Sequence, residues 1–268
     1  MTVALPPPSA ESTCLVTGAS SGIGAEIARG LAERGHGVTL VARREERLRE
    51  LADELAEQGV RAETVAADVS DDGGRERLVR EVDERGLAVE VLVNNAGFGT
   101  GGAFVELEGD TEASMVRTNV EAVVGLSSAY LPRMTERGRG AVLNVASLIA
   151  FQPVPFQATY GASKAFVLSF SDALHEELRG TGVTVTAVCP GPVRTEFGQS
   201  GGFGGADDRI PGFLWLSADK VAADALEGLE RGERVVVPGP INQVAALYGQ
   251  HLPRFLLLPL VRRVWPVS

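Results

Sequence analysis

The sequence predicts an α/β fold with a doubly wound parallel sheet, and three observations lead to this prediction. Short apolar runs typical of buried strands alternate with longer segments of helical periodicity along most of the chain. A glycine-rich turn connects the first apolar run to the first helical segment. The chain has 268 residues, of which 44% are hydrophobic, and α/β folds of this size often form a single unit. We therefore expect one domain over residues 1–268, with variable segments at 196–216 and 238–268.

The first strand and helix carry a signal for nucleotide binding. Residues Thr13–Thr17 form an apolar run, GASSGIG follows at Gly18–Gly24, and a helical segment extends to about Arg34. Glycines let the backbone approach a pyrophosphate closely, and the N–H groups at the start of the helix favour an anion. A glycine-rich turn alone indicates no more than a tight turn. Between a strand and a helix, it predicts a Rossmann-like dinucleotide site.

The end of the second predicted strand, Gly37–Ala42, bears on the choice of cofactor. Dinucleotide folds usually place an acidic residue there for the ribose 2′-hydroxyl, but this chain continues with Arg43 and Arg44. An acid would repel a 2′-phosphate, whereas arginine can pair with it through two hydrogen bonds. The alternative is that both arginines only begin a surface helix, although a positive charge there opposes the helix dipole. The pattern favours NADP(H) over NAD(H).

Two further strands end in polar or small residues. The run Ala62–Ala67 ends at Asp68, a candidate contact for an adenine ring, and a polar helix is predicted over Asp72–Arg85. The fourth run, Val89–Val93, leads into NNAG at Asn94–Gly97. Open α/β sheets bind ligands at the carboxyl ends of their strands, so these residues are candidates for binding. Equally, NNAG suits an ordinary turn.

A long helix is predicted from Glu112 to about Arg137, with Asn119 near its middle. An amide inside a helix is slightly unfavourable unless it faces solvent or satisfies a buried group. The apolar run Ala141–Ala146 is predicted to be the fifth strand, and Ser147 follows it directly.

Ser147, Tyr160 and Lys164 form the pattern that points to chemistry. Tyr160 and Lys164 are four residues apart in a helical segment, so both side chains project from one face. A free phenol titrates near ~10, and a fixed ammonium one turn away would stabilise the phenolate. The alternative is a half-buried tyrosine beside a solvated charge, but this chain has only two lysines among its 25 basic residues. We therefore expect an acid/base site here.

The last third of the chain begins with a sixth strand, Val183–Val188, and a rigid turn at Cys189–Thr195. The glycine-rich segment Glu196–Gly212 is predicted to be a lid over the site, or otherwise a surface loop. We expect a helix over Ser217–Arg231, capped by Ser217, and a short strand at Arg234–Val237.

The C-terminal segment from Ile241 onward is apolar, with three arginines interspersed, and would suit an amphipathic segment at a membrane surface. A flap over the substrate pocket or a subunit contact is the preferred interpretation, because Pro253 and Pro259 should interrupt any long helix.

Composition excludes several classes of protein. The net charge of −10 argues against nucleic acid as a partner. Cys14 and Cys189 lie in apolar runs, and neither a disulfide framework nor metal-ligand spacing is present, so we expect no metal. The N-terminal sequence shows no secretory signal, and no uninterrupted apolar run of the sequence approaches the length needed to span a bilayer, which predicts a cytoplasmic location.

Taken together, the motifs resemble those of the short-chain dehydrogenase/reductase family in its compact single-domain form. The matching elements are TGASSGIG at Thr17–Gly24, NNAG at Asn94–Gly97, Asn119, Ser147, YxxxK at Tyr160 and Lys164, and Pro190, Gly191 and Thr195. They span about residues 13 to 195 in the order of the family. One departure is Ala146 where a serine usually precedes the catalytic position.

The resemblance implies hydride transfer between NADP(H) and a small-molecule carbonyl or secondary alcohol, such as a 3-oxoacyl group or another apolar ketone. Tyr160 would be the general acid/base, and Ser147 would bind the substrate oxygen. Lys164 would hold the nicotinamide ribose and lower the phenol pKa, and Asn119 would anchor a water in the proton path. A homodimer or homotetramer would form through the helices of Asn119 and Tyr160. The alternative is a catalytically silent dinucleotide sensor or scaffold, but such proteins generally lose the tyrosine or lysine.

The resemblance also implies which residues bind the cofactor. The pyrophosphate would contact the glycine-rich turn, the 2′-phosphate would contact arginine, and the adenosine and nicotinamide would contact the ends of later strands. These residues are Gly18, Ser20, Ser21, Gly22, Ile23 and Gly24; Arg43 and Arg44; Asp68 and Val69; Asn95, Ala96 and Gly97; Tyr160 and Lys164; and Pro190, Gly191, Val193 and Thr195.

Overall fold

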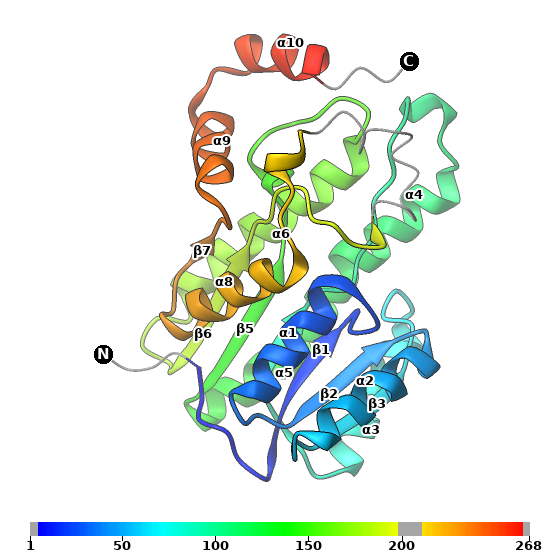
Figure 1. Ribbon diagram of the computed structural model, residues 1–268, viewed down its shortest axis with the longest axis vertical. Coiled ribbons are helices and arrows are strands. Elements are labelled where there is room, and N and C mark those ends of the chain that lie inside the picture. Colours follow the sequence, from blue (N-terminus) through cyan, green and yellow to red (C-terminus); the bar gives the residue numbers. More distant parts are fainter. Residues whose placement is uncertain (1–4, 198–210, 265–268) are drawn as a thin grey trace.

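The computed structural model describes residues 5–197 and 211–264, and its centre is one seven-stranded parallel sheet (Figure 1). The strand order is β3-β2-β1-β4-β5-β6-β7, so the chain reverses direction across the sheet between β3 and β4. This confirms the predicted doubly wound α/β fold. The strands are β1 Ser12–Thr17, β2 Val38–Ala42, β3 Ala62–Ala66, β4 Ala88–Asn94, β5 Gly140–Val145, β6 Val183–Val188 and β7 Val235–Val236.

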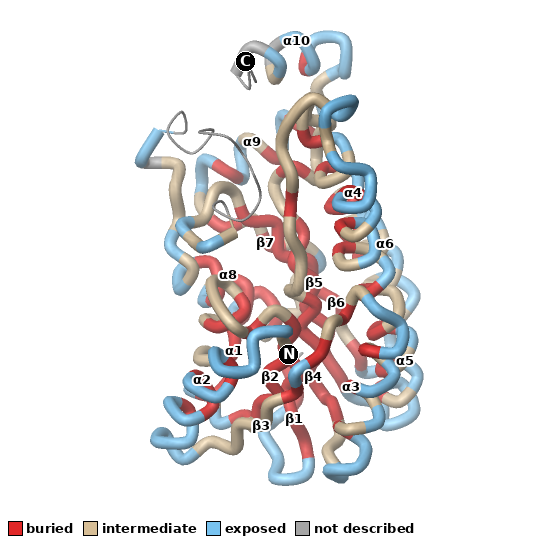
Figure 2. Tube along the Cα trace, turned by 90° about the vertical axis from the view of Figure 1, so that its right-hand side faces the viewer, coloured by how far each residue is buried: buried red, intermediate tan, exposed pale blue. Residues whose placement is uncertain are grey.

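Helices cover both faces of the sheet because successive strand residues point to opposite sides. On one face, Val16 packs in a cluster with side chains of α1, α2 and α8. On the other face, Leu15 packs in a cluster with side chains of α3 and α5, and α6 contributes Leu174. The central strands are buried almost throughout, whereas the edge strand β3 is only partly buried (Figure 2). These helices are α1 Gly22–Glu33, α2 Glu45–Glu57, α3 Asp72–Glu84, α5 Ala122–Arg137, α6 Ala158–Glu177 and α8 Ala218–Glu230.

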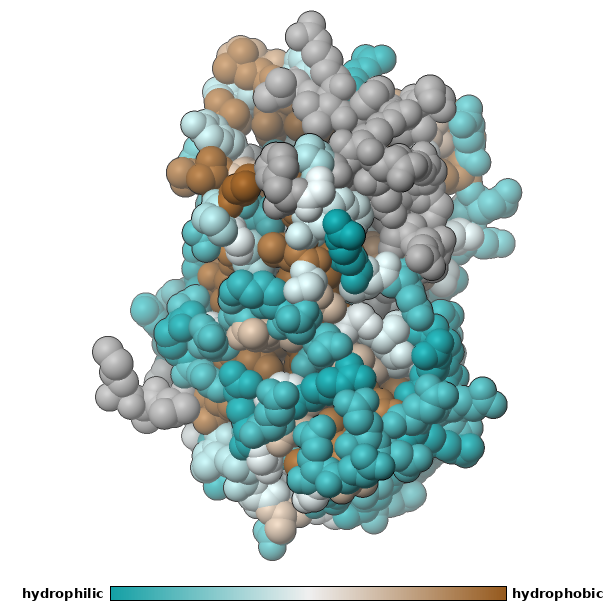
Figure 3. Space-filling model, viewed as in Figure 1, coloured by the Kyte–Doolittle hydropathy of each residue, from teal (hydrophilic) through white to brown (hydrophobic). Residues whose placement is uncertain are grey.

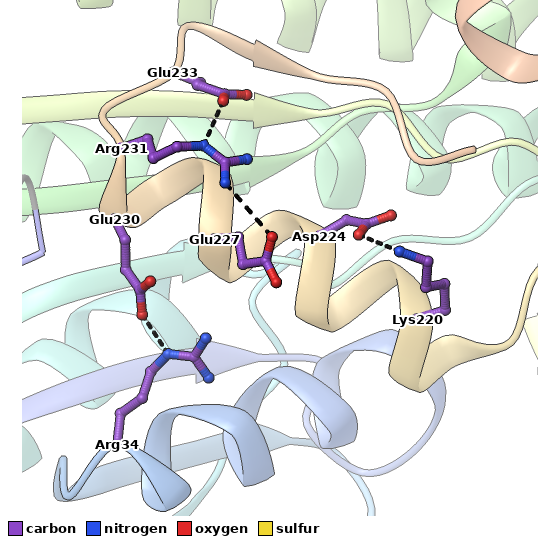
Figure 4. A network of polar contacts seen from close by, with 7 residues as sticks. All are labelled: Arg34, Lys220, Asp224, Glu227, Glu230, Arg231 and Glu233. Atoms are coloured by element: carbon purple, nitrogen blue, oxygen red, sulfur yellow. Dashed lines mark hydrogen bonds and ion pairs between the residues drawn. The ribbon is translucent and has the colours of Figure 1, made fainter. Parts of the chain in front are cut away.

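The contact between α1 and α8 shows how closely these layers pack. A Cβ at Gly30 would lie 2.6 Å from Leu226 Cδ1, so a larger residue at position 30 would require the Leu226 side chain to move. At the edge of the contact, Arg34 Nε donates to Glu230 at 2.5 Å (Figure 4). Ser217 precedes α8 as predicted, but its side chain does not cap the helix. Instead, a hydrogen bond from Ser217 lowers the pKa of Asp219.

The predicted long helix begins earlier than expected and is irregular in the middle. It starts as α4, Gly109–Val116, passes through a π-helical turn, η2, at Arg117–Glu121, and continues as α5. Single π turns inside α-helices are frequent at functional sites, and Asn119 lies in this one.

Two helices follow β7 at the C-terminal end, α9 Pro240–His251 and α10 Arg254–Val264. Pro253 lies between them, as predicted. The prediction that Pro259 would also interrupt the segment was wrong, since α10 runs through it, as α5 runs through Pro132. A proline removes one backbone donor, and both helices continue past this loss. Among residues 5–197 and 211–264, no helix has the length and hydrophobicity needed to cross a bilayer.

The hydroxyl of Thr17 joins the carboxyl ends of β1 and β4. Its Oγ1 donates to Val93 O at 3.1 Å and accepts from Asn95 N at 2.9 Å and Ala96 N at 3.0 Å. The Asn95 amide nitrogen donates back to Thr17 O at 2.9 Å. One threonine therefore sets the distance between the glycine-rich turn and the NNAG turn.

Replacing Thr17 with valine should destabilise the fold by about 2 kcal/mol, because two backbone N–H groups lose their acceptor. Thr186→Val is the matched control, since Thr186 is a fully buried strand threonine whose hydroxyl has no hydrogen-bond partner among the described residues. That change should be neutral or stabilising. Urea unfolding of both variants measures their free energies of unfolding, and an equal loss of stability in the two variants would contradict the role of Thr17.

Candidate active site

The predicted glycine-rich turn lies against the end of β4 and leaves no room for larger residues. Gly18 has φ +65°, and a Cβ there would lie 2.9 Å from Ala96 Cα. A Cβ at Gly24 would lie 2.5 Å from Gly18 O. The turn is therefore compact, with its backbone at the amino end of α1, as a pyrophosphate requires. Ser20, Ser21, Gly22 and Ile23 complete this turn.

Asn95 holds the glycine-rich turn in place instead of pointing away from it. Its amide nitrogen donates to Thr17 O and, at 3.2 Å, to Gly18 O. The side-chain donor is thus used within the protein, so a contact of Asn95 with an adenosine ribose would need another of its atoms. Ala96 follows it and contacts Gly18.

Arg43 and Arg44 lie at the carboxyl end of β2, as predicted, and both are exposed. Arg44 Nη2 donates to Ser20 Oγ at 3.0 Å and Ser21 Oγ at 2.8 Å, so its guanidinium lies beside the glycine-rich turn. Arg44 Nη1 also donates to Glu196 Oε2 at 2.8 Å. This hydrogen bond and the positive charge of Arg44 lower the pKa of Glu196. Sequence reasoning missed Glu196, which is 152 residues away from its partner.

Asp68 and Val69 follow β3 farther along the same edge of the sheet. Burial would raise the pKa of Asp68, but hydrogen bonds from Ser70 and the charge of Arg43 outweigh it and lower the pKa. Ser70 N and Ser70 Oγ donate to Asp68 Oδ1 at 2.9 and 2.6 Å. Val69 is buried, and its carbonyl accepts from Arg75. The structure therefore groups Asp68 with Arg43 at the predicted adenine end, away from Tyr160.

Asn119 is buried in the π turn η2, and both ends of its side-chain amide are hydrogen-bonded within the protein. Its Oδ1 accepts from Phe98 N at 3.1 Å, and its Nδ2 donates to Phe98 O at 2.9 Å. The same nitrogen donates to Ser163 Oγ at 3.0 Å. Asn119 thus joins the segment after β4 to α6. Ser163, which sequence reasoning missed, is the contact on α6.

Ser147, Tyr160 and Lys164 converge at the carboxyl end of β5, as predicted. Ser147 directly precedes the 3₁₀ turn η3, Leu148–Phe151, and its hydroxyl hydrogen-bonds the phenol of Tyr160. The ammonium of Lys164 lies 5.9 Å from the centroid of the Tyr160 ring. It donates to Val145 O at 2.8 Å. A Cβ at Gly97 would lie 3.5 Å from this ammonium, so NNAG ends beside the lysine.

Burial dominates the pKa values of the two titratable groups. It raises the pKa of Tyr160 to about 12, although the hydrogen bond with Ser147 acts in the opposite direction. Burial also lowers the pKa of Lys164 to about 8. The sequence predicted a lowered phenol pKa, and the structure gives the reverse because removal of water from the phenol outweighs its polar contacts. Tyr160 is therefore protonated at neutral pH.

Two aromatic residues that sequence reasoning did not identify lie near Tyr160, Phe197 in space and Phe156 in the sequence. The ring of Phe197 lies 5.8 Å from the ring of Tyr160. Phe156, just before α6, has φ +67°, which is uncommon for a residue other than glycine. Its carbonyl accepts from Gly102 N at 2.9 Å, which joins the turn before α6 to the segment after β4. The only indication of these two residues in the sequence was that Phe156 lies shortly before Tyr160 and Phe197 shortly after Thr195.

The turn after β6 closes the site from the other side. Thr195 contacts the glycine-rich turn, since a Cβ at Gly22 would lie 3.1 Å from Thr195 Cγ2. Pro190 O accepts from Leu148 N at 2.8 Å, which fixes the backbone beside Ser147. Val193 forms a bridge with Leu216, so the two ends of the predicted lid meet. Residues 198–210 of that lid lie outside the described residues.

Gly191 accommodates α9. A Cβ at Gly191 would lie 2.5 Å from Asn242 Oδ1. Pro190, Gly191, Val193 and Thr195 thus connect the site to the C-terminal helices. Among the described residues, no group of three or more His, Cys, Asp or Glu side chains could hold a metal ion.

These residues fit a dinucleotide. The compact turn at Gly18 and Gly24 lies beside two exposed arginines, and the same edge of the sheet leads to the buried lysine and the tyrosine. All predicted site residues lie at the carboxyl edge of the sheet, with Asp68 and Val69 at its far end. The arrangement places one phenolic donor and one hydroxyl where they can bind the same small polar group.

Comparisons with known proteins agree with this geometry. A family model described as short chain dehydrogenase matches residues 12–202. A short chain dehydrogenase of Pseudocercospora fijiensis is 39% identical over 188 residues, which cover 69% of this chain but only 61% of that protein.

Two solved structures have a similar fold. A short-chain dehydrogenase from Sphingobium yanoikuyae in complex with NADPH has a TM-score of 0.79 and 36% identity, covering 89% of this chain and 92% of that chain. An actinorhodin polyketide ketoreductase with NADPH has a TM-score of 0.75 and 37% identity, covering 85% and 95%. The motifs, the fold and these matches lead to one conclusion: the chain belongs to the short-chain dehydrogenase family.

Proposed function

We propose that this protein is an NADP(H)-dependent oxidoreductase that interconverts a ketone and a secondary alcohol. One observation carries the proposal: the side chains of Ser147 and Tyr160 are hydrogen-bonded, with the Lys164 ammonium buried beside the tyrosine ring. A nicotinamide cofactor, when bound, supplies or accepts the hydride. No observation favours the alternative of a catalytically silent sensor or scaffold. Proteins of that kind generally lose the tyrosine or the lysine, and here Tyr160 and Lys164 are both present and lie together.

Tyr160 is the general acid/base of the proposed reaction. With its pKa raised to about 12, the phenol carries its proton at neutral pH and can donate it to an oxygen that gains negative charge. Ser147 binds the same oxygen through its hydroxyl. The ammonium of Lys164 favours the phenolate that remains after proton transfer. Asn119 acts as a positioning residue, because its amide is occupied by Phe98 and Ser163 and holds α6.

The preference for NADP(H) rests on charge at the end of β2. Arg43 and Arg44 are exposed there, and Arg44 already lies beside Ser20 and Ser21 of the glycine-rich turn. A 2′-phosphate would meet two guanidinium groups at this point, where an acid would repel it. The bound NADPH in both solved structures described above supports this choice.

An apolar carbonyl suits the surroundings of the tyrosine. Phe197 lies against Tyr160, and Ile149 and Phe151 follow Ser147 in η3. A polyketide ketoreductase among the similar structures makes a 3-oxoacyl group one candidate substrate. Segments 196–216 and 238–268 would then determine which ketone is accepted.

We also propose a homodimer or homotetramer through α5 and α6, consistent with exposed Phe166 on α6. A cytoplasmic location stays a prediction.

Replacing Tyr160 with phenylalanine should lower the rate of ketone reduction by about 10²-fold or more, because the variant has no proton to donate. NADPH binding should be nearly unchanged. The measurement is NADPH consumption over a panel of apolar ketones, with binding followed by nucleotide fluorescence.

The matched control is Tyr248→Phe, the same change at an exposed tyrosine of α9. It should leave the rate unchanged. Full activity of the Tyr160 variant would refute the mechanism. Silence of the unmodified protein towards every ketone, despite tight NADPH binding, would favour a sensor.

The two directions of the reaction should respond oppositely to pH. Reduction needs the protonated phenol and the Lys164 ammonium, so its rate should stay level at neutral pH and begin to fall as pH rises through the Lys164 pKa of about 8, while the phenol keeps its proton until its own pKa of about 12. Alcohol oxidation needs the phenolate, whose fraction grows roughly tenfold per pH unit below that pKa. Steady-state profiles of kcat in both directions test this, and an oxidation rate that fell with rising pH below the Lys164 pKa of about 8 would contradict it.

Glu196 should compete with the 2′-phosphate for Arg44. Removing its charge in Glu196→Gln should strengthen NADPH binding by roughly two- to fivefold, the range expected for an exposed ion pair, and leave NADH binding unchanged. Glu45→Gln is the control, since Glu45 is a nearby exposed acid that pairs with Arg49 instead.

Calorimetry of both nucleotides measures these affinities. Arg43→Ala and Arg44→Ala should weaken binding of NADPH more than binding of NADH. Equal affinity of the unmodified protein for the two nucleotides would count against the NADP(H) assignment.

A further inference from the structure

Helix α9 presents its large apolar side chains to the outside. Its buried stripe consists of Asn242, Ala246 and Gly249, which are small or polar. Its exposed apolar residues are larger and lie three or four positions apart: Ile241 at 49% exposed, Val244 at 54%, Leu247 at 58% and Tyr248 at 59%. A surface helix normally buries its large apolar face. The outer face of α9 therefore has the composition of a contact surface.

Helix α10 continues this surface. Leu257 is buried at 4% exposed, whereas Phe255 is 73% exposed, Leu256 54% and Leu258 37%. Figure 3 shows hydrophobic residues gathered at the end of the molecule where α9 and α10 lie. We call these exposed residues of α9 and α10 the C-terminal apolar surface.

The charge of this segment is opposite to that of the rest of the chain. All 35 acidic residues lie in the first 233 positions, and the last of them is Glu233. From position 234 onward the sequence contains four arginines and no acid, in a protein of net charge −10. Arg254 and Arg262 are exposed on α10 itself. The surface is thus apolar, with cationic groups among the apolar residues.

The combination of apolar side chains and arginines favours an anionic lipid surface over a second copy of the chain as the partner. In a symmetric dimer the same patch meets itself, so Arg254 and Arg262 would face a patch that holds arginines and no acid. An anionic lipid surface offers hydrocarbon for Phe255, Leu256 and Tyr248 and phosphate groups for the arginines. Helices with an apolar face and interspersed arginines bind such surfaces in the plane of the headgroups.

We propose that the C-terminal apolar surface docks this protein on an anionic membrane surface, with α9 and α10 lying on the lipid. This replaces the preference for a flap or subunit contact, which relied on Pro253 and Pro259 both interrupting the segment, whereas only Pro253 does so. The docked helices would hold the site near the lipid, because α9 contacts Gly191 and, through Gly249, Phe151. The proposal is independent of the catalytic assignment.

Flotation of the full chain with vesicles tests this docking. Vesicles of phosphatidylcholine mixed with phosphatidylglycerol should carry the protein upward at low salt, and phosphatidylcholine alone should carry much less. Added salt should weaken the binding, since the arginine contribution is electrostatic. Absence of flotation of the unmodified protein with anionic vesicles would overturn the proposal.

Two double variants identify the residues. Phe255→Ser with Leu256→Ser should abolish flotation, and Arg254→Gln with Arg262→Gln should lower the partition coefficient roughly tenfold or more. Arg49→Gln with Arg179→Gln changes the net charge equally at exposed sites on α2 and after α6, and should bind as the unmodified protein does. If both double arginine variants lost flotation equally, a local role for α10 in lipid binding would be refuted.

Unfolding midpoints and light scattering complete the test. Unchanged midpoints in all variants exclude misfolding as the cause of lost flotation. If the Phe255 and Leu256 change dissociated an oligomer while the unmodified protein ignored lipid, the surface would be a contact between copies, and the proposal would fail.

Discussion

The buried ammonium of Lys164 is the constraint on which the site depends. A charge in this position is costly unless it is hydrogen-bonded, and Val145 O accepts from it at 2.8 Å. The bond ties α6 to the end of β5, so the helix cannot rotate without losing it. One turn earlier on the same face, Tyr160 is thereby held beside Ser147. Gly97 leaves the space that the ammonium occupies.

A layer of amides and hydroxyls below the site supports this arrangement. Asn94 Nδ2 donates to Asn144 Oδ1 at 2.8 Å, and Asn144 Nδ2 donates to Ser171 Oγ at 2.9 Å. These bonds connect β4 and β5 to α6 through fully buried side chains, in parallel with the contact between Asn119 and Ser163. Asn94 Oδ1 has no hydrogen-bond partner among the described residues, but the bonds that do form fix one register, because displacement would leave further buried groups unsatisfied. The same helix is therefore held from two sides.

The C-terminal third follows a different packing rule from the rest of the chain. In the sheet and its covering helices, most large apolar residues point inward, and Phe166 of α6 is an exposed exception. In α9 the inward residues are Asn242, Ala246 and Gly249, because the helix must approach the turn at Gly191 and the segment at Phe151 closely. The large residues are consequently left outside. The small inward residues of α9 thus explain both its closeness to the site and the exposure of its large apolar residues.

Local features of the sequence determined the sheet, the glycine-rich turn, the positions of Asn119, Ser147, Tyr160 and Lys164, and the arginines after β2. Strand runs, helical spacing and turn residues act over a few positions, so they can be read directly from the chain. Only the tertiary structure decided the pairing of Arg44 with Glu196, the raised pKa of Tyr160, the continuation of α10 through Pro259 and the outward face of α9. These features depend on which distant segments meet and on how much water they exclude, and neither is encoded in the order of neighbouring residues.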